Sequence, residues 1–107
     1  MDYPQFDLQG QVAVVTGASK GIGYGLARAL AHAGARVAVA ARDMDALQGL
    51  ADEIRAEGGE ALPVYLDVRD VSQIREVMQG VKDHFGQLDI LVNNAGLGAN
   101  HAAVDVT

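Results

Sequence analysis

The sequence contains no cysteine, which excludes disulfide bonds, iron–sulfur clusters and thiol nucleophiles. It also has no apolar run that approaches the roughly 20 residues of a membrane-spanning helix. The first residues, MDYPQFDLQG, include acidic side chains and no apolar stretch, so they do not resemble a signal peptide. We therefore expect a cytoplasmic protein that does not enter a membrane.

Positive charge is scarce, because 8 lysine and arginine residues stand against 14 aspartate and glutamate residues, for a formal net charge of −6. This balance disfavours nucleic acid and anionic membranes as partners, and no basic cluster offsets it locally. No spacing of histidines and carboxylates indicates a metal site. Half of the 107 residues are hydrophobic, which is enough for the core of one domain or of part of one.

Short apolar runs alternate with stretches of helical spacing along the chain. The runs predict four strands, at Val12–Val15, Val37–Ala40, Leu62–Leu66 and Leu88–Val92. The helical stretches predict three helices, from Gly21 to about Ala33, from Asp43 to the glycines at 58 and 59, and from Asp70 through Val81. We expect Asp43 and Asp70 to cap the second and third helices, with Gln73 returning a bond to Asp70.

This alternation predicts an α/β fold, namely a Rossmann-like, doubly wound parallel sheet with helices on both faces. The first four strands of such a sheet lie in the order 3-2-1-4. Pro63 cannot donate to a ladder, and it agrees with this order because the third strand is then at an edge. A complete doubly wound domain has two such halves, so we interpret residues 1–107 as the N-terminal part of a single, incomplete domain. The fourth strand should then have an unpaired edge, and a helix should begin near Thr107.

The turn between the first strand and the first helix has the sequence TGASKGIG, residues 16–23. A dinucleotide pyrophosphate needs backbone N–H donors at a helix N-terminus and no side chain in the way. Gly17 allows the sharp turn, while Gly21 and Gly23 allow close approach of the phosphate and of the helix to the strand. The spacing differs from the common G-x-G-x-x-G fingerprint, and an ordinary tight turn is the alternative. Its place in a β-α-β unit favours dinucleotide binding.

Three motifs in this order resemble those of the short-chain dehydrogenase/reductase family, and the resemblance runs from about Leu8 to Thr107. TGASKGIG is similar to the cofactor motif of the T-G-x-x-x-G-x-G subgroup. Asp67 and Val68 resemble the pair that contacts the adenine ring, and residues 93–96 match the family's N-N-A-G motif. Without the resemblance, Asp67 would be interpreted as the cap of the next turn, and the two asparagines as turn residues.

The end of the second strand bears on the choice between NAD and NADP. NAD-binding relatives carry an acid here that bonds the ribose 2′-hydroxyl, but this sequence has Ala41. Arg42 instead offers a guanidinium fork for a 2′-phosphate, and Lys20 can add a second positive charge. Asp43 is assigned to capping, and two solvated surface cations are the alternative for Arg42 and Lys20. We predict NADP(H) as the preferred cofactor, while NAD(H) stays open. The predicted cofactor-binding residues are Gly17, Ser19, Lys20, Gly21, Ile22, Gly23, Arg42, Asp67, Val68, Asn93, Ala95 and Gly96.

The resemblance implies an oxidoreductase that uses NADP(H) to transfer a hydride between nicotinamide and a small-molecule alcohol or carbonyl substrate. The family's catalytic serine and Tyr-x-x-x-Lys pair lie beyond the fourth strand and are not in this sequence. Tyr24 with Arg28, and Tyr65 with Arg69, copy only the spacing. We therefore assign no catalytic residue and expect the chain alone to be inactive. For an intact parent, the resemblance implies homo-oligomers formed through later helices.

Two other interpretations stay open. The first is a catalytically silent nucleotide-binding or interaction module that is complete at this length. The second is a Rossmann-like methyltransferase, which fits the same strand order but does not account for the N-N-A-G motif. Neither the substrate nor the oligomeric state is predicted.

Overall fold

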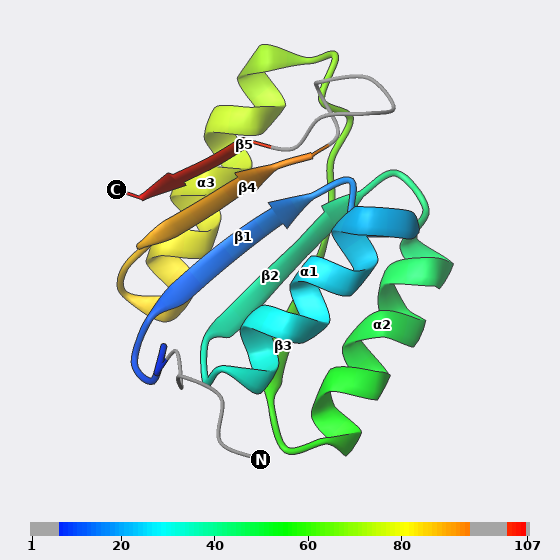
Figure 1. Cartoon of the computed structure of the whole chain (residues 1–107). Coiled ribbons are helices and arrows are strands. Elements are labelled where there is room, and N and C mark those ends of the chain that lie inside the picture. The colour runs from blue at the N-terminus through cyan, green and yellow to red at the C-terminus, as the bar shows by residue number, and fades with distance from the viewer. Residues whose placement is uncertain (1–6, 95–102, 107) are drawn as a thin grey trace.

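A twisted sheet of five strands, in the order β3-β2-β1-β4-β5, forms the centre of the molecule (Figure 1). The structure is a computed structural model that describes residues 7–94 and the backbone of residues 103–106. The strands are β1 (Val12–Thr16), β2 (Arg36–Ala41), β3 (Glu60–Tyr65), β4 (Ile90–Asn93) and β5 (Ala103–Val106). The helices are α1 (Gly21–His32), α2 (Met44–Ala56) and α3 (Val71–Phe85).

The four strands expected from the sequence are all present, and they lie parallel in the predicted order 3-2-1-4. β1 is central, since its Val14 pairs with Ala38 of β2 and with Leu91 of β4. Pro63 lies opposite Val39 on β3, the outermost strand, as its missing N–H requires. The doubly wound architecture is therefore confirmed.

The far side of β4 differs from the expectation of an unpaired edge. β5 lies antiparallel beside β4, with Val92 opposite Val104 and Asn93 opposite Ala103. The helix expected to begin near Thr107 is not tested, because Thr107 lies outside the described residues. Residues 94–102 are too few for the crossover of a dozen or more residues that a parallel neighbour needs, so the chain can return beside β4 only in the antiparallel sense.

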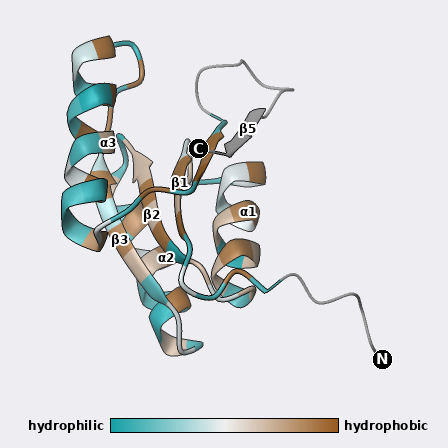
Figure 2. Ribbon diagram, turned by 90° about the vertical axis from the view of Figure 1, so that its left-hand side faces the viewer, coloured by the Kyte–Doolittle hydropathy of each residue, from teal (hydrophilic) through white to brown (hydrophobic). Residues whose placement is uncertain are grey.

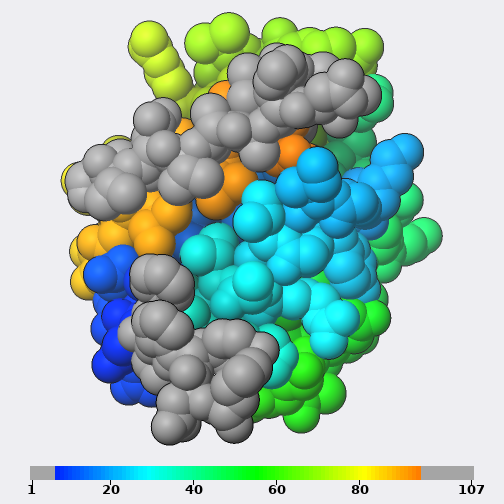
Figure 3. Space-filling view, viewed as in Figure 1, coloured from blue at the N-terminus to red at the C-terminus, as the bar shows by residue number. Residues whose placement is uncertain are grey.

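Each face of the sheet has its own apolar layer. Successive residues of β1 and β2 point to opposite faces. Val15 and Val39 therefore pack under α1 and α2, whereas Val12 and Val14 pack with Val81 of α3. Figure 2 shows the result, with hydrophobic strands in the middle, α3 on one side and α1 and α2 on the other. In the space-filling view, side chains of α1 and α2 form much of the coloured surface of the face they cover (Figure 3). Along the part of the chain that is described, no helix has the length and apolar character needed to cross a membrane.

The predicted helix caps are present, with one change. The Asp43 carboxylate accepts from the backbone N–H of Ala46 at 3.1 Å and caps α2. The Asp70 carboxylate accepts from the N–H groups of Ser72 and Gln73 and caps α3. The return bond from Gln73 to Asp70, however, was wrongly predicted. The Asp70 N–H already donates to the Asp67 carbonyl at 3.0 Å, so the Gln73 side chain accepts from the Asp67 N–H instead, at 3.3 Å.

Candidate functional site

An open cleft of about 590 Å³ lies where β1, β2 and β3 end at their carboxyl termini. Doubly wound sheets bind ligands at this edge, near the strand at which the order reverses, and that strand here is β1. The volume is in the range of small-molecule sites. The cleft is lined by Gly17, Ser19, Lys20, Ala41, Arg42, Asp43, Leu66, Asp67, Val68 and Arg69. It thus brings together six of the predicted cofactor-binding residues from three separate loops.

The glycines of the turn between β1 and α1 lie where the backbone conformation or the close packing disfavours any other residue. Gly17 and Gly21 have φ angles of 64° and 63°, in the left-handed region. A Cβ on Gly23 would overlap the carbonyl oxygen of Gly17 and lie 2.9 Å from Nδ2 of Asn94. Gly23 therefore lets the first turn of α1 approach the end of β1, as the sequence predicted. Contact of these glycines with a phosphate stays a prediction.

The N-terminus of α1 is open to the cleft side of the sheet. Lys20 is the N-cap residue in an extended conformation, with no side-chain cap, and no acidic residue lies in the first turn. The first N–H groups of a helix lack intrahelical partners and carry partial positive charge. Ile22, in the same turn, is an accessible apolar side chain, 57% exposed. Such an arrangement can hold a phosphate group.

Asn93, the last residue of β4, and Asn94, which follows it, both bind the beginning of the glycine-rich turn. The Thr16 hydroxyl donates to Oδ1 of Asn93 at 3.2 Å and accepts from the backbone N–H of Asn94 at 3.1 Å. Nδ2 of Asn94 donates to the Gly17 carbonyl at 3.4 Å. Asn94 thus binds a backbone group of the turn, while contact of Asn93 with the cofactor stays a prediction. Ala95 and Gly96, the rest of the motif, lie outside the described residues.

Thr16 was not among the predicted site residues, although it begins the TGASKGIG turn. Its hydroxyl joins the ends of two neighbouring strands, because β1 and β4 are in register there, with Thr16 opposite Asn93. Thr16 is only 2% exposed, so its hydroxyl needs buried partners. A polar residue that ends an otherwise apolar strand is the signal that could have indicated this role.

Asp67 is bound by the residue two positions later in the chain. Its Oδ1 accepts from the backbone N–H and from Nε of Arg69, both at 3.0 Å, and its Oδ2 accepts from Nη2 at 2.7 Å. These bonds from the Arg69 side chain and backbone lower the pKa of Asp67 from 3.8 to about 2. The structure therefore shows the turn-capping role that the sequence left open. Contact with an adenine amino group stays a prediction.

Arg42 and Lys20 are the cations of the cleft that no carboxylate neutralises directly. Both are exposed, and neither forms an ion pair with any residue in the described ranges. Asp43, the nearest acid in sequence, uses Oδ1 to cap α2. The Arg42 guanidinium thus provides a positive charge directly after β2, where the sequence predicted it.

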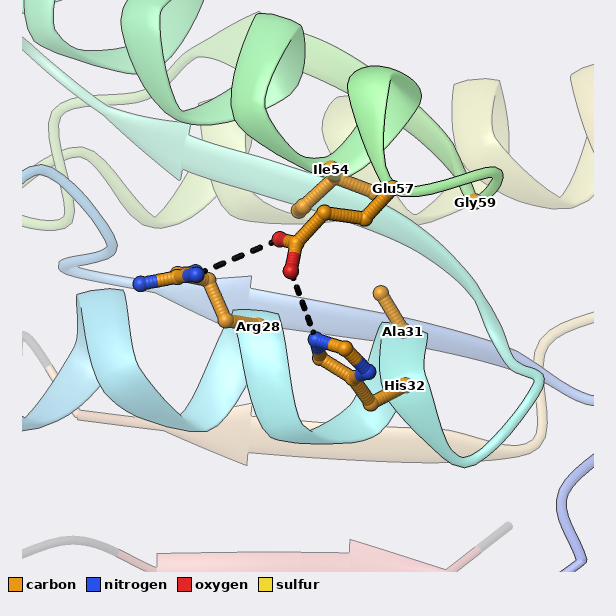
Figure 4. Close-up of a pocket in the computed structure, with 6 residues that line it drawn as sticks. All are labelled: Arg28, Ala31, His32, Ile54, Glu57 and Gly59. Carbon is orange, nitrogen blue, oxygen red and sulfur yellow. Dashed lines mark hydrogen bonds and ion pairs between the residues drawn. The ribbon is translucent and has the colours of Figure 1, made fainter.

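The Tyr24 and Arg28 pair lies elsewhere, on α1, and Figure 4 shows Arg28 at the contact between α1 and α2. Glu57 accepts from Nη2 of Arg28 at 3.2 Å, and its other oxygen lies 2.9 Å from Nε2 of His32. The hydrogen bond with His32, and then that with Arg28, lowers the pKa of Glu57. The neighbouring cavity has a volume of about 10 Å³, which is room for one water molecule at most. This cluster joins two helices and has no space for a substrate.

Comparison with known proteins gives consistent matches along most of the chain. A family model described as "short chain dehydrogenase" matches residues 11–107. A short chain dehydrogenase of Pseudocercospora fijiensis is 44% identical over 101 residues, which cover 94% of this chain and 33% of that protein. The solved structure of a short-chain type dehydrogenase/reductase from Mycobacterium marinum is 50% identical with a TM-score of 0.82, covering 89% of this chain and 38% of that one.

A metagenomic short-chain oxidoreductase, whose structure was solved in complex with NADP, is 49% identical with a TM-score of 0.80. The match covers 85% of this chain and 41% of that one. The present chain therefore spans between 33% and 41% of the length of these three relatives.

Proposed function

Because this chain belongs to the short chain dehydrogenase family, we propose that it forms the cofactor-binding part of an NADP(H)-dependent oxidoreductase. The observation that carries the proposal is the cleft itself, in which the glycine-rich turn, Asp67 and two cations that form no ion pair among the described residues meet. When bound, the nicotinamide supplies or accepts the hydride. The substrate of the whole protein would be a small-molecule alcohol or carbonyl compound.

Each part of the cofactor has residues suited to hold it. The first N–H groups of α1 would bind the pyrophosphate, because the glycines leave the approach open. Asp67 and Val68 would contact the adenine ring at the far side of the cleft. Arg42 and Lys20 would bind a 2′-phosphate, because a guanidinium and an ammonium group both form charge-assisted hydrogen bonds with phosphate oxygens.

The preference for NADP(H) rests on the end of β2. Ala41 is 8% exposed and carries no carboxylate for a ribose 2′-hydroxyl, and Arg42 follows it at the rim of the cleft. The NADP complex of the metagenomic relative supports this choice, since that protein has the same fold at 49% identity.

The cofactor preference can be tested by titrating this chain with NADP⁺ and NAD⁺ while following its resistance to urea. A ligand that binds only the folded state raises the free energy of unfolding with the logarithm of the ligand concentration divided by its dissociation constant. We expect NADP⁺ to bind at least about tenfold more tightly than NAD⁺, because a charge-assisted hydrogen bond contributes a free energy of that size. Arg42→Ala should remove most of this difference, whereas Asp43→Asn, which keeps a capping side chain, should retain it. Equal or tighter binding of NAD⁺ would contradict the proposal.

We further propose that hydride transfer needs the part of the relatives that this chain does not span. The residues described around the cleft include no tyrosine or serine placed as a proton donor to a substrate carbonyl; Ser19 lies in the phosphate turn. The isolated chain should therefore bind cofactor without oxidising NADPH in the presence of carbonyl compounds. Turnover by this chain would refute that expectation. A cytoplasmic location and homo-oligomers of the whole protein belong to the same proposal.

A further inference from the structure

An ion pair between Asp67 and Arg69 lies in the cleft beside Arg42. We propose that Arg69 neutralises the Asp67 carboxylate so that Arg42 is left to bind a 2′-phosphate, which makes Arg69 a determinant of cofactor specificity. The inference rests on the proposed function, because it concerns the choice between NADP and NAD at the same site.

The charges that line the cleft would oppose one another without Arg69. Asp67 and Arg42 are close enough that the positive charge of Arg42 acts on the Asp67 carboxylate. An unpaired Asp67 carboxylate would therefore attract the Arg42 guanidinium. It would also repel a phosphate monoester, which carries between one and two negative charges at neutral pH.

The structure shows that Asp67 is not left unpaired. Arg69 binds both of its carboxylate oxygens, at 3.0 and 2.7 Å, in the planar two-bond arrangement that is the strongest guanidinium–carboxylate contact. The Arg69 backbone N–H adds a third bond at 3.0 Å. The Asp67 side chain is 20% exposed and that of Arg69 76% exposed, so the carboxylate faces its partner and the guanidinium faces the solvent.

Backbone hydrogen bonds in the turn before α3 position the Asp67–Arg69 pair. The Asp67 carbonyl accepts from the Asp70 N–H, and the Asp67 N–H donates to the side chain of Gln73. The backbone N–H and carbonyl of Asp67 are thus both bound within the turn that precedes α3, and Arg69 lies in the same turn. The neutralised carboxylate is therefore positioned by residues next to it in the chain.

A rival explanation is that Arg69 only covers the oxygens that would accept the adenine amino group. The two explanations predict different results for 2′,5′-ADP and 5′-AMP, which share the adenosine and differ in the 2′-phosphate. If Arg69 only covers the Asp67 oxygens, it weakens the binding of both ligands equally. If Arg69 neutralises the Asp67 carboxylate, it favours the binding of 2′,5′-ADP alone.

The test compares Arg69→Gln with Arg75→Gln, a matched change at an exposed position of α3 that forms no ion pair with any described residue. The ratio of the two dissociation constants is measured for each variant at low salt. Arg69→Gln should reduce the preference for 2′,5′-ADP by about fivefold or more, as expected for one unit charge beside a partly solvated site. Arg75→Gln should leave the ratio unchanged.

A double variant separates neutralisation from direct contact of Arg69 with the phosphate. In Arg69→Gln with Asp67→Asn, no carboxylate remains to be neutralised, so the preference for 2′,5′-ADP should return. Failure to return, an unchanged ratio in Arg69→Gln, or tighter binding of both ligands would each overturn the inference. If the unmodified chain shows no preference, the proposed function fails first and the inference fails with it.

Discussion

Gly23 shows how closely the first turn of α1 approaches the end of β1. A methyl group there would meet the Gly17 backbone, which cannot rotate away as a side chain could. We expect Gly23→Ala to lower the free energy of unfolding by about 1–3 kcal/mol, the usual cost of overpacking. It should also weaken cofactor binding, because the turn would have to shift. Urea unfolding and NADP⁺ titration measure the two effects.

Gly25, two residues later in α1, provides the matched control. Apart from Gly25 itself, its chain neighbours and the nearby backbone of α1, no atom of the described residues lies within 4 Å of a Cβ placed on Gly25. Gly25→Ala should therefore stabilise the chain by about 0.5–1 kcal/mol, because alanine loses less backbone entropy in a helix. If the two alanine variants changed stability in the same direction, the close approach at Gly23 would not be the controlling feature.

Some residue roles could be predicted from the sequence because they depend on neighbours within a few positions. The cap of α2 by Asp43 and the left-handed conformation of Gly17 are of this kind, since both follow from local backbone geometry. The Asp67–Arg69 pair is equally local but was not predicted. A carboxylate two residues before an arginine can turn toward it or toward a ligand, and only the side-chain conformations decide between the two.

At the scale of strands, Asp89 joins the beginnings of β1 and β4. Its Oδ2 accepts from the Val12 N–H at 2.8 Å, and its own N–H donates to the Val12 carbonyl at 2.9 Å. Val12 is fully buried, so its N–H has no access to water. From the sequence, Asp89 was only a polar interruption of an apolar run. Its role requires the approach of segments 77 residues apart.

We expect Asp89→Ala to cost about 1–3 kcal/mol of stability, because it leaves the Val12 N–H unpaired in the core. Asp89→Asn keeps an acceptor oxygen and should cost clearly less. Urea unfolding compares the two, and hydrogen exchange at Val12 reports the bond directly. Equal losses in both variants would mean that the negative charge matters, and not the acceptor.

The elements themselves were predicted with different success. β1 and β2 were recognisable because nearly every residue in them is buried, which produces continuous apolar runs. β5 was missed, because its four residues, AVDV, are short and include an acid. Its existence depends on the neighbouring strand, and no local pattern shows that the chain turns back beside β4.

For the whole molecule, the carboxylates determine how stability changes with pH. Hydrogen bonds lower the pKa of Asp67, Asp70 and Glu57 in the folded chain. A group whose pKa is lowered by folding contributes its full stabilisation above its unfolded pKa and loses it as the pH falls. Stability should therefore decline from about pH 4.5, the ordinary value for glutamate, toward pH 2, the value reached by Asp67.

The measurement is the urea midpoint at several pH values between 5 and 2, with Asp67→Asn as the comparison. This variant lacks the carboxyl group whose pKa is lowered to about 2, so its stability should change less at the acid end of the range. A midpoint that rose on acidification would show that repulsion among the acids, in a chain of net charge −6, outweighs their bonds.

The central position of β1 also has a consequence in time. Its partner β2 is synthesised soon after it, whereas Val12 bonds a side chain 77 residues later. At about 5–20 residues per second, this separation corresponds to roughly 4 to 15 seconds of synthesis. During that interval one edge of a strand of five buried residues has no partner in its own chain. A newly made molecule is thus exposed to chaperones and to neighbouring chains until β4 emerges.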